Sequence, residues 1–324
     1  MRQAAGRKAD QPLLGIALIL CAWLAFSFID TSAKWLALAG IASLQLAFMR
    51  YIGAFAISLA MLNRHGVDWD NFKSDRMFLV IVRGSLLMGS TILNFFAVRY
   101  LSLTLTSTIL FSAPIIITAL AGPLLGERVG IWRWIAIIIG FGGILVAVQP
   151  FGATFHPAVF LSMSAALCFS FYAILTRKLS ETESTATLQF YAGLVGTVTL
   201  LPFAILQWQN PTNAMDWVIM IGLGFFGWFG HELLTRAHEY APASTLTPYT
   251  YAFILYLAIW SALVFNDWPT WSTVIGASIV IGSGIFIWLR ERKLERQKTL
   301  DAQASLICLN FRVLQQASTD QAGL

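Results

Sequence analysis

Residues 107–149 read STILFSAPIIITALAGPLLGERVGIWRWIAIIIGFGGILVAVQ and contain two long apolar runs joined by a short polar loop. The charged residues of this stretch, Glu127, Arg128 and Arg133, all lie in the loop or directly beside it. About 20 mostly apolar residues are enough for an α-helix to cross the hydrocarbon core of a bilayer. The stretch therefore predicts two consecutive transmembrane helices connected at one membrane surface.

The same alternation of apolar runs and short polar loops extends over most of the 324 residues. Charged residues make up only 11% of the chain and apolar residues 57%, whereas a soluble domain has about 25% charged residues. So few charges cannot cover a water-exposed surface, and we predict an all-α membrane protein with ten transmembrane helices. The expected spans are residues 13–34, 42–62, 77–98, 102–122, 130–149, 157–176, 186–206, 215–236, 242–265 and 270–289.

Lysine and arginine residues are divided unevenly between the two sides that ten spans define. If both termini are cytoplasmic, almost all of the 21 Lys and Arg residues fall in cytoplasmic segments, and only Lys34 and Arg99 face the other side. This is the positive-inside pattern, so we predict a multi-pass protein of the bacterial inner membrane with both termini in the cytoplasm. The net charge of +5 then reflects orientation, and no basic face is long enough to bind nucleic acid.

The two ends of the chain differ from its apolar body. Residues 1–12 carry Arg2, Arg7 and Lys8 before the first apolar run, as a signal peptide does. The run is long and has no small-residue cleavage pattern, so we interpret it as an uncleaved first helix after a cytoplasmic N-terminus. Residues 291–324 are mixed and polar, and we expect a cytoplasmic, disordered tail without an assignable function.

An internal repeat relates the two halves of the chain. Matching residues recur at shifts of 140 to 143 positions, and the drift fits small loop insertions. Five spans in each half require the second half to enter the membrane from the opposite side. We therefore predict two inverted repeats, residues 13–149 and 157–290, which is an architecture of alternating-access carriers. The matches include Phe26-Ser27-Phe28 with Phe169-Ser170-Phe171, Lys34 with Arg177, Tyr51 with Tyr191, Gly53 with Gly193, Gly84 with Gly224, and Glu127 with Asp267.

Several of these residues carry a resemblance to a known family. The segment from Ser107 to Pro114, the run Pro123-Leu-Leu-Gly-Glu127-Arg128, and the glycines from Gly140 to Gly143 resemble the EamA-type domain of the drug/metabolite transporter superfamily. The second half departs from this pattern, because Asp267 replaces the usual glutamate and no basic residue follows it. The resemblance implies a ten-helix secondary carrier for small organic solutes, often an exporter.

Motifs typical of enzymes or of cofactor-binding proteins are incomplete, absent or in the wrong structural context. The run Gly222-Leu-Gly224-Phe-Phe-Gly227 matches a dinucleotide fingerprint, but it lies inside one apolar span instead of between a strand and a helix. His231-Glu232 begins like a zinc-peptidase motif that lacks its second histidine, and no phosphate-binding P-loop occurs. The three cysteines form no C-x-x-C pair. We therefore expect no catalytic residues, no cofactor and no metal.

Ionisable residues inside the spans are the best pointers to a site, because a charge in the bilayer core usually faces a cavity or a partner. By helix rise, Asp30 lies about 7 Å and Arg50 about 12 Å below the same membrane surface. We expect the two side chains to approach each other, either as a structural ion pair or as contacts for solute or proton. Arg83, near the cytoplasmic end of its span, is interpreted as an anchor.

Further polar side chains complete the candidate substrate-binding set. Pro248 removes a backbone donor and is expected to bend its span, which would expose polar groups there. Asn94 either bonds another helix or the solute, and His231 with Glu232 either lines the site or reaches the interface. The candidates are Asp30, Arg50, Asn94, Trp228, His231, Glu232, Tyr249 and Tyr251.

The charges inside the spans nearly cancel, and residues 242–265 contain no Lys or Arg. A polyanion would need cationic partners, so we expect a neutral, zwitterionic or aromatic solute, moved by secondary active or facilitative transport. A riboflavin-type vitamin uptake carrier is the alternative to an amino-acid or metabolite exporter; an intramembrane enzyme and a structural membrane protein are remote alternatives. The partners considered are a small organic solute, membrane lipid, a proton or counter-solute, and a second copy of the chain in a homodimer.

Overall fold

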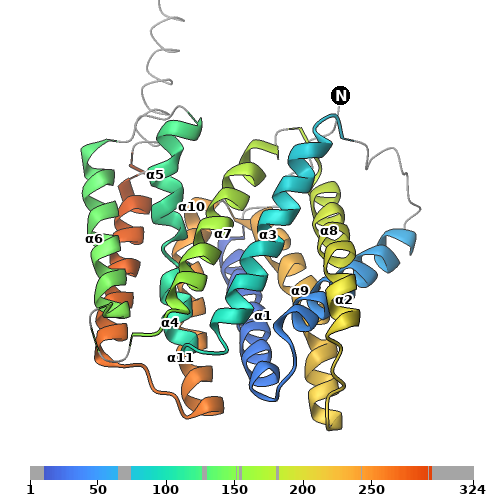
Figure 1. Ribbon diagram of the computed structural model, residues 1–324. Helices are drawn as coiled ribbons and strands as arrows, with labels where there is room; N and C mark the ends of the chain where they lie inside the picture. The colour runs from blue at the N-terminus through green and yellow to red at the C-terminus, as the bar shows by residue number, and fades with distance from the viewer. Residues whose placement is uncertain are drawn as a thin grey trace, which may run out of the picture. The chain divides into compact units, whose positions relative to one another are not determined.

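The computed structural model describes residues 11–64, 74–125, 130–150, 152, 155–179, 182–241, 243–290 and 292–293. The helices up to Phe265 lie side by side (Figure 1). The contacts discussed below all lie within the compact unit that ends at Gly284. The helices are α1 (Pro12–Leu38), α2 (Ser43–Arg64), α3 (Met77–Ala97), α4 (Leu103–Leu110), α5 (Ala113–Leu125), α6 (Ile131–Val148), α7 (Val159–Leu179), α8 (Thr185–Leu206), α9 (Ala214–Tyr240), α10 (Ala243–Leu246), the 3₁₀ helix η2 (Thr247–Tyr251), α11 (Ala252–Phe265) and a last helix at Trp271–Arg290.

The structure contains ten stretches that are long and apolar enough to cross a membrane. The predicted fold class, an all-α protein with ten spans, is therefore confirmed. Two helices run about one turn further than predicted, α1 to Leu38 and α9 to Tyr240. The prediction ended these spans at Lys34 and Arg236, but each of these charges is paired with a carboxylate and does not end its helix.

Glycines related by the internal repeat make close helix contacts. A Cβ atom added to Gly53 of α2 would lie 2.7 Å from the Cα atom of Gly224 on α9. A Cβ atom added to Gly84 of α3 would lie 3.3 Å from the Cα atom of Ala192 on α8, beside Gly193. Small residues let helix backbones approach closely in membranes. The two halves therefore use corresponding positions to bring α2 against α9 and α3 against α8.

The α2–α9 contact leads to a stability prediction. In Gly224→Ala the new methyl group would lie 2.5 Å from the Cα atom of Gly53, so the helices must move apart. We expect a loss of about 1–3 kcal/mol of stability from this overpacking, measured as a lower melting temperature of the purified protein in detergent. Gly222→Ala on the same helix is the control, because its new Cβ meets only the Phe226 ring at 3.6 Å. Equal melting temperatures for both variants would contradict the close contact.

Two of the spans are interrupted. The fourth span consists of α4 and α5, which are separated at Phe111 and Ser112. The ninth span begins as α10, continues as the 3₁₀ helix η2, and becomes α-helical again in α11. Pro248 lies in the first turn of η2, so the predicted departure from regular helix at this proline is confirmed.

The interruptions occupy corresponding places in the two repeats. Adding 140 to Phe111 gives Tyr251, the last residue of η2, and the two rings lie 5.3 Å apart between centroids. On the first-repeat side, the Ser170 hydroxyl of α7 donates to the Ala166 carbonyl at 2.7 Å and lies 3.4 Å from the Ala113 carbonyl at the start of α5. Matching interruptions in the two halves of a carrier point to its binding site. The region around Phe111 and Tyr251 is therefore a candidate binding region.

Candidate solute-binding site

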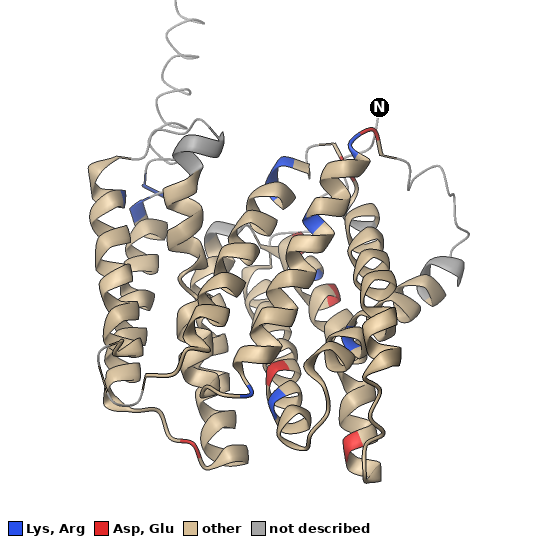
Figure 2. Ribbon diagram, in the orientation of Figure 1, with Lys and Arg blue, Asp and Glu red and all other residues tan. Residues whose placement is uncertain are grey.

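A polar cluster lies where α1, α2, α3 and α9 meet, whereas charged residues along the described helices are otherwise sparse (Figure 2). Asp30 of α1 and Asn94 of α3 are buried. The Asp30 carboxyl group lies next to the Asn94 side-chain amide and within electrostatic range of the Arg50 guanidinium on α2. His231 of α9 lies within range of the same guanidinium. Four candidates from the sequence, on four different helices, are thus brought together.

The Arg50 guanidinium is held by a single side chain. Its Nη1 atom donates to the Thr91 hydroxyl, which itself donates to the Leu87 carbonyl at 3.0 Å and lies 3.1 Å from the Tyr51 hydroxyl. The guanidinium carbon lies 5.5 Å from the Tyr51 ring centroid. An arginine side chain has five N–H donors. Within the described residues only one donor of Arg50 is used, so the others remain available for a solute.

The expected approach of Asp30 and Arg50 is seen as proximity within one cluster and not as a direct contact. Among the described residues, ion pairs within 4.0 Å join Lys34 to Asp267 and Arg236 to Glu232. Arg50 bonds Thr91 instead, and Asp30 lies against Asn94. The two opposite charges are therefore close enough to feel each other without occupying each other's hydrogen-bonding sites.

Aromatic rings continue from the polar cluster toward the interrupted spans. The Phe26 ring lies 5.0 Å from the His231 ring and 5.6 Å from the Trp23 ring. The Trp23 ring in turn lies 5.9 Å from Phe111 and 5.4 Å from Phe253 of α11. The buried Trp23 Nε1 atom has no hydrogen-bond partner within the described structure. Rings and an unpaired N–H donor thus adjoin the charged cluster.

The remaining sequence candidates are placed differently. Tyr251 is buried and contacts Phe111, so it belongs to the aromatic run. Tyr249 is 37% exposed. Glu232 pairs with Arg236 one turn along α9 at 2.7 Å, and their side chains are 37% and 59% exposed. The ring contacts shown for Trp228 are with Phe225 and Phe229 of the same helix. The structure therefore does not bring Trp228, Glu232 or Tyr249 into the cluster.

Arg83 is an anchor, but inside the helix bundle instead of at the membrane surface. Its side chain is buried and donates to the Thr176 hydroxyl at 2.7 Å, the Leu188 carbonyl at 2.9 Å and the Tyr172 hydroxyl at 3.0 Å. The guanidinium carbon also lies 4.6 Å from the Tyr172 ring centroid. These bonds tie α3 to α7 and α8, so three of the five Arg83 donors are used by the protein.

Sequence reasoning missed the ion pair between Lys34 and Asp267, because it placed each residue at a membrane surface without a partner. The internal repeat includes both positions, since it matches Lys34 with Arg177 and Glu127 with Asp267, but it does not pair Lys34 with Asp267. Glu127, Arg128 and the tail from residue 294 lie outside the described residues. Within the described residues no group of three or more His, Cys, Asp or Glu side chains is placed to hold a metal ion.

Comparison with known proteins gives the family. The model of the EamA-like transporter family matches residues 13–149 and again residues 156–289. An S-adenosylmethionine uptake transporter of Rickettsia bellii is 29% identical over 88% of this chain and 97% of its own length. A riboflavin transporter of Vibrio cholerae is 27% identical over 89% of this chain and 97% of its own, and a pseudopaline exporter of Pseudomonas aeruginosa is 24% identical over 82% and 93%.

A solved crystal structure shares the fold, with a TM-score of 0.61 and 15% identity over 89% of this chain and all of the other. The family and these relatives are transporters and not enzymes, and their named cargoes are small metabolites. Ten spanning helices and bacterial relatives of this kind identify a multi-pass inner-membrane protein. This small-metabolite transporter belongs to the EamA-like transporter family.

Proposed function

We propose that the protein carries a metabolite with both positive and negative charges and an aromatic ring system across the inner membrane by alternating access. S-adenosylmethionine is the representative substrate. The observation that carries this proposal is the Asp30–Arg50 cluster, which continues through aromatic rings to the meeting point of the two interrupted spans. Charged groups would be held in the cluster, and the ring system along Phe26 and Trp23.

The two charges of the cluster suit a solute that carries both signs. An isolated charge at the centre of a membrane helix costs roughly 2.5–3.5 kcal/mol or more, so a bound counter-charge stabilises each residue. The free donors of Arg50 fit a carboxylate, which arginine holds with two parallel hydrogen bonds. Asp30 fits an ammonium or sulfonium group, and the neighbouring rings add cation–π attraction. A polyanion would leave Asp30 facing charge of its own sign.

The relatives supply two cargoes to compare. S-adenosylmethionine has an adenine ring, a positively charged sulfonium centre and an amino-acid group with both charges. Riboflavin has a larger ring system and no charged group at neutral pH. The aromatic run suits either molecule, and this observation makes riboflavin the second candidate. The pair of opposite charges, Asp30 buried and Arg50 partly buried, favours the first.

The transport cycle follows from the repeats. The two interrupted spans meet at Phe111 and Tyr251, where a solute held between the halves would contact both. The sequence contains no phosphate-binding P-loop, so we expect a proton or counter-solute gradient to drive transport. The positive-inside pattern places both termini in the cytoplasm, and a reporter fused after residue 10 that is active in the periplasm would overturn this orientation.

The substrate is tested with two ligands that differ by one charge. S-adenosylmethionine is expected to raise the melting temperature of the purified protein, because a ligand at 100 times its Kd stabilises the native state by about 2.7 kcal/mol. S-adenosylhomocysteine lacks the sulfonium charge, and we expect it to bind about tenfold more weakly, a difference of about 1.4 kcal/mol. In Asp30→Asn this difference should disappear, because the carboxylate that recognises the cation is gone.

Counterflow in proteoliposomes decides whether binding leads to transport. Vesicles loaded with unlabelled S-adenosylmethionine should accumulate labelled S-adenosylmethionine without ATP. Accumulation of riboflavin alone would replace the first candidate by the second. Failure of both compounds to bind and to exchange would refute the proposal.

A further inference from the structure

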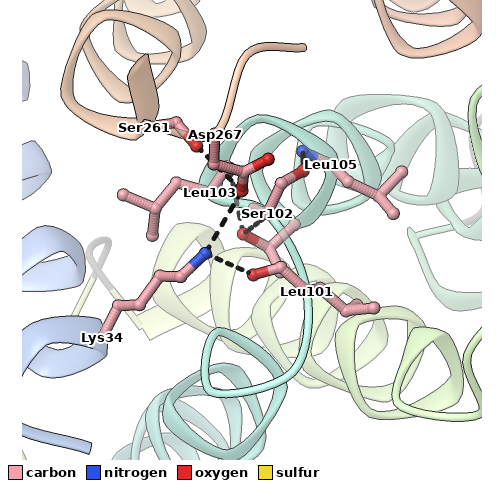
Figure 3. A network of polar contacts seen from close by, with 8 residues as sticks. Lys34, Leu101, Ser102, Leu103, Leu105, Ser261 and Asp267 are labelled. Atoms are coloured by element: carbon pink, nitrogen blue, oxygen red, sulfur yellow. Dashed lines mark hydrogen bonds and ion pairs between the residues drawn. The ribbon is translucent and has the colours of Figure 1, made fainter. Parts of the chain in front are cut away.

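Lys34 makes a second polar site, separate from the Asp30–Arg50 cluster, near the C-terminal end of α1. Its side chain is buried, with 9% exposed. The Nζ atom donates to the Leu101 carbonyl at 3.0 Å and to Asp267 Oδ2 at 3.4 Å (Figure 3). The Phe265 ring centroid lies 5.0 Å from the same ammonium group. One cation is thus held by a carbonyl, a carboxylate and an aromatic ring from two segments of the chain, around Leu101 and around residues 265–267.

The two oxygen acceptors stand beside the start of one interrupted span and the end of the other. Leu101 lies two residues before Leu103, where α4 begins, and Asp267 lies two residues after Phe265, where α11 ends. The ammonium group of α1 therefore joins the ends of α4 and α11 at the same place. The interruptions of these spans lie at Phe111 and Tyr251, and the rings of these two residues belong to the candidate solute-binding site.

Hydrogen bonds within the two turns hold the two acceptors in place independently of the lysine. The Asp267 backbone N–H donates to the Ser261 carbonyl at 3.0 Å, and the Ser261 hydroxyl donates to Asp267 Oδ2 at 3.3 Å. The turn is made possible by Asn266, whose φ of 52° is left-handed, a conformation that asparagine tolerates better than most residues. On the other side, the Ser102 hydroxyl accepts from Leu105 N at 3.1 Å and caps α4. The site around Lys34 is therefore built from ordered turns.

The contacts of α1 with α9 include close packing of small residues and rings, and these do not separate as easily as the polar contacts of Lys34. A Cβ atom added to Gly15 would lie 2.7 Å from Ala241 Cβ, and one added to Gly230 would lie 2.5 Å from the Phe26 ring. Trp35 Nε1 also donates to Asp216 Oδ1 at 2.8 Å, beside Lys34 on α1. These contacts hold α1 and α9 together as one body. The Lys34 contacts with Asp267 and Leu101 are polar, and the Asp267 side chain is 38% exposed to solvent, so water can replace the lysine.

We propose that Lys34 is the gate cation of this carrier. It holds the ends of α4 and α11 against α1 in the conformation that is closed at the Lys34 end, and it releases them when that end opens. Opening separates the two interrupted spans and gives a solute access to the rings at Phe111 and Tyr251. The inference rests on alternating access in the proposed function, but not on the identity of the solute.

A removable cross-link tests whether these segments must part. Lys34→Cys and Asp267→Cys are introduced together after Cys21, Cys168 and Cys308 are replaced by serine, and a short bis-methanethiosulfonate reagent joins the two thiols. Cross-linked protein should lose at least about tenfold of its S-adenosylmethionine counterflow, and reductant should restore it. Each single-cysteine variant, treated in the same way, is the control. Undiminished counterflow after complete cross-linking would show a static strut and overturn the proposal.

A second measurement needs no solute and no cysteine. Lys34→Met keeps an apolar stem against Phe265 but removes the charge, whereas Lys34→Arg keeps it. Loss of a coupling between segments of 1–3 kcal/mol changes an opening equilibrium about fivefold or more. We therefore expect amide hydrogen exchange of residues 101–105 to rise at least about fivefold in Lys34→Met and to change little in Lys34→Arg. Unchanged exchange in Lys34→Met would refute the gate even if S-adenosylmethionine proves not to be the cargo.

Discussion

Arg50→Gln is expected to abolish transport and to leave the protein folded. Within the described residues the Arg50 guanidinium donates only to Thr91, so its removal takes one hydrogen bond from one hydroxyl. That hydroxyl still donates to the Leu87 carbonyl and still lies against Tyr51. A hydrogen bond to a charged group contributes about 1.5–3 kcal/mol, so loss of two such bonds to a solute carboxylate should lower uptake about 100-fold or more.

The measurement compares protein yield, melting temperature and S-adenosylmethionine counterflow for three variants. If Arg50 and Asp30 form a structural unit, Arg50→Gln and Asp30→Asn will each reduce yield, and the double neutral variant will recover it. If Arg50 holds the solute, the double variant will fold and not transport. Arg50→Lys keeps the charge but not the planar fork, so it should transport poorly. Wild-type behaviour of both single variants would contradict a role for the pair in either form.

The spans could be predicted closely because the physical requirement on them is simple. A bilayer demands about 20 apolar residues for each helix, and such runs are visible in the sequence without any knowledge of contacts. The predicted end of a span differs from the structure where a charged residue stands near the end of the apolar run. Lys34 and Arg236 were treated as membrane ends, but each has a carboxylate partner and lies within its helix.

Lateral contacts of the site residues could not be predicted in the same way. Helix rise gives the depth of a residue, but not which neighbouring helix its side chain meets. Depth alone placed Asp30 and Arg50 in one region, and the structure agrees. Depth also made Glu232 a candidate. In the structure the Glu232 carboxylate instead accepts a hydrogen bond from Arg236 on the same helix, outside the cluster. The partners of Arg83 lie on α7 and α8, far away in sequence.

Residues that break the internal repeat add to the case for a solute. The repeat relates Asp30 to Ala173 by a shift of 143, and Arg50 to Phe190 by a shift of 140. The scaffold contacts through Gly53, Gly84 and Gly224 follow the repeat, but the two opposite charges of the cluster do not. A solute with unlike ends needs an asymmetric site. Asp30 and Arg50, which differ between the two repeats, are therefore the residues to which the proposed function assigns the charged ends of the solute.

Arg83 provides the opposite case to Arg50, and Arg83→Gln is expected to unfold much of the protein. The Arg83 side chain is buried and its three hydrogen bonds end on the Thr176 and Tyr172 side chains and the Leu188 carbonyl. Each hydrogen bond to a charged group contributes about 1.5–3 kcal/mol, so the variant should lose roughly 3–6 kcal/mol of stability, allowing for partial repair by the shorter amide.

The loss should appear as low yield and as a melting temperature lowered by roughly 6 °C or more. Arg236→Gln is the matched control, because its exposed pair with Glu232 is worth at most about 0.5 kcal/mol. Any Arg83→Gln protein that does fold should still bind S-adenosylmethionine, since the solute groups are assigned to Asp30 and Arg50. A variant with normal stability and no transport would instead place Arg83 in the solute site and reverse the roles given to the two arginines.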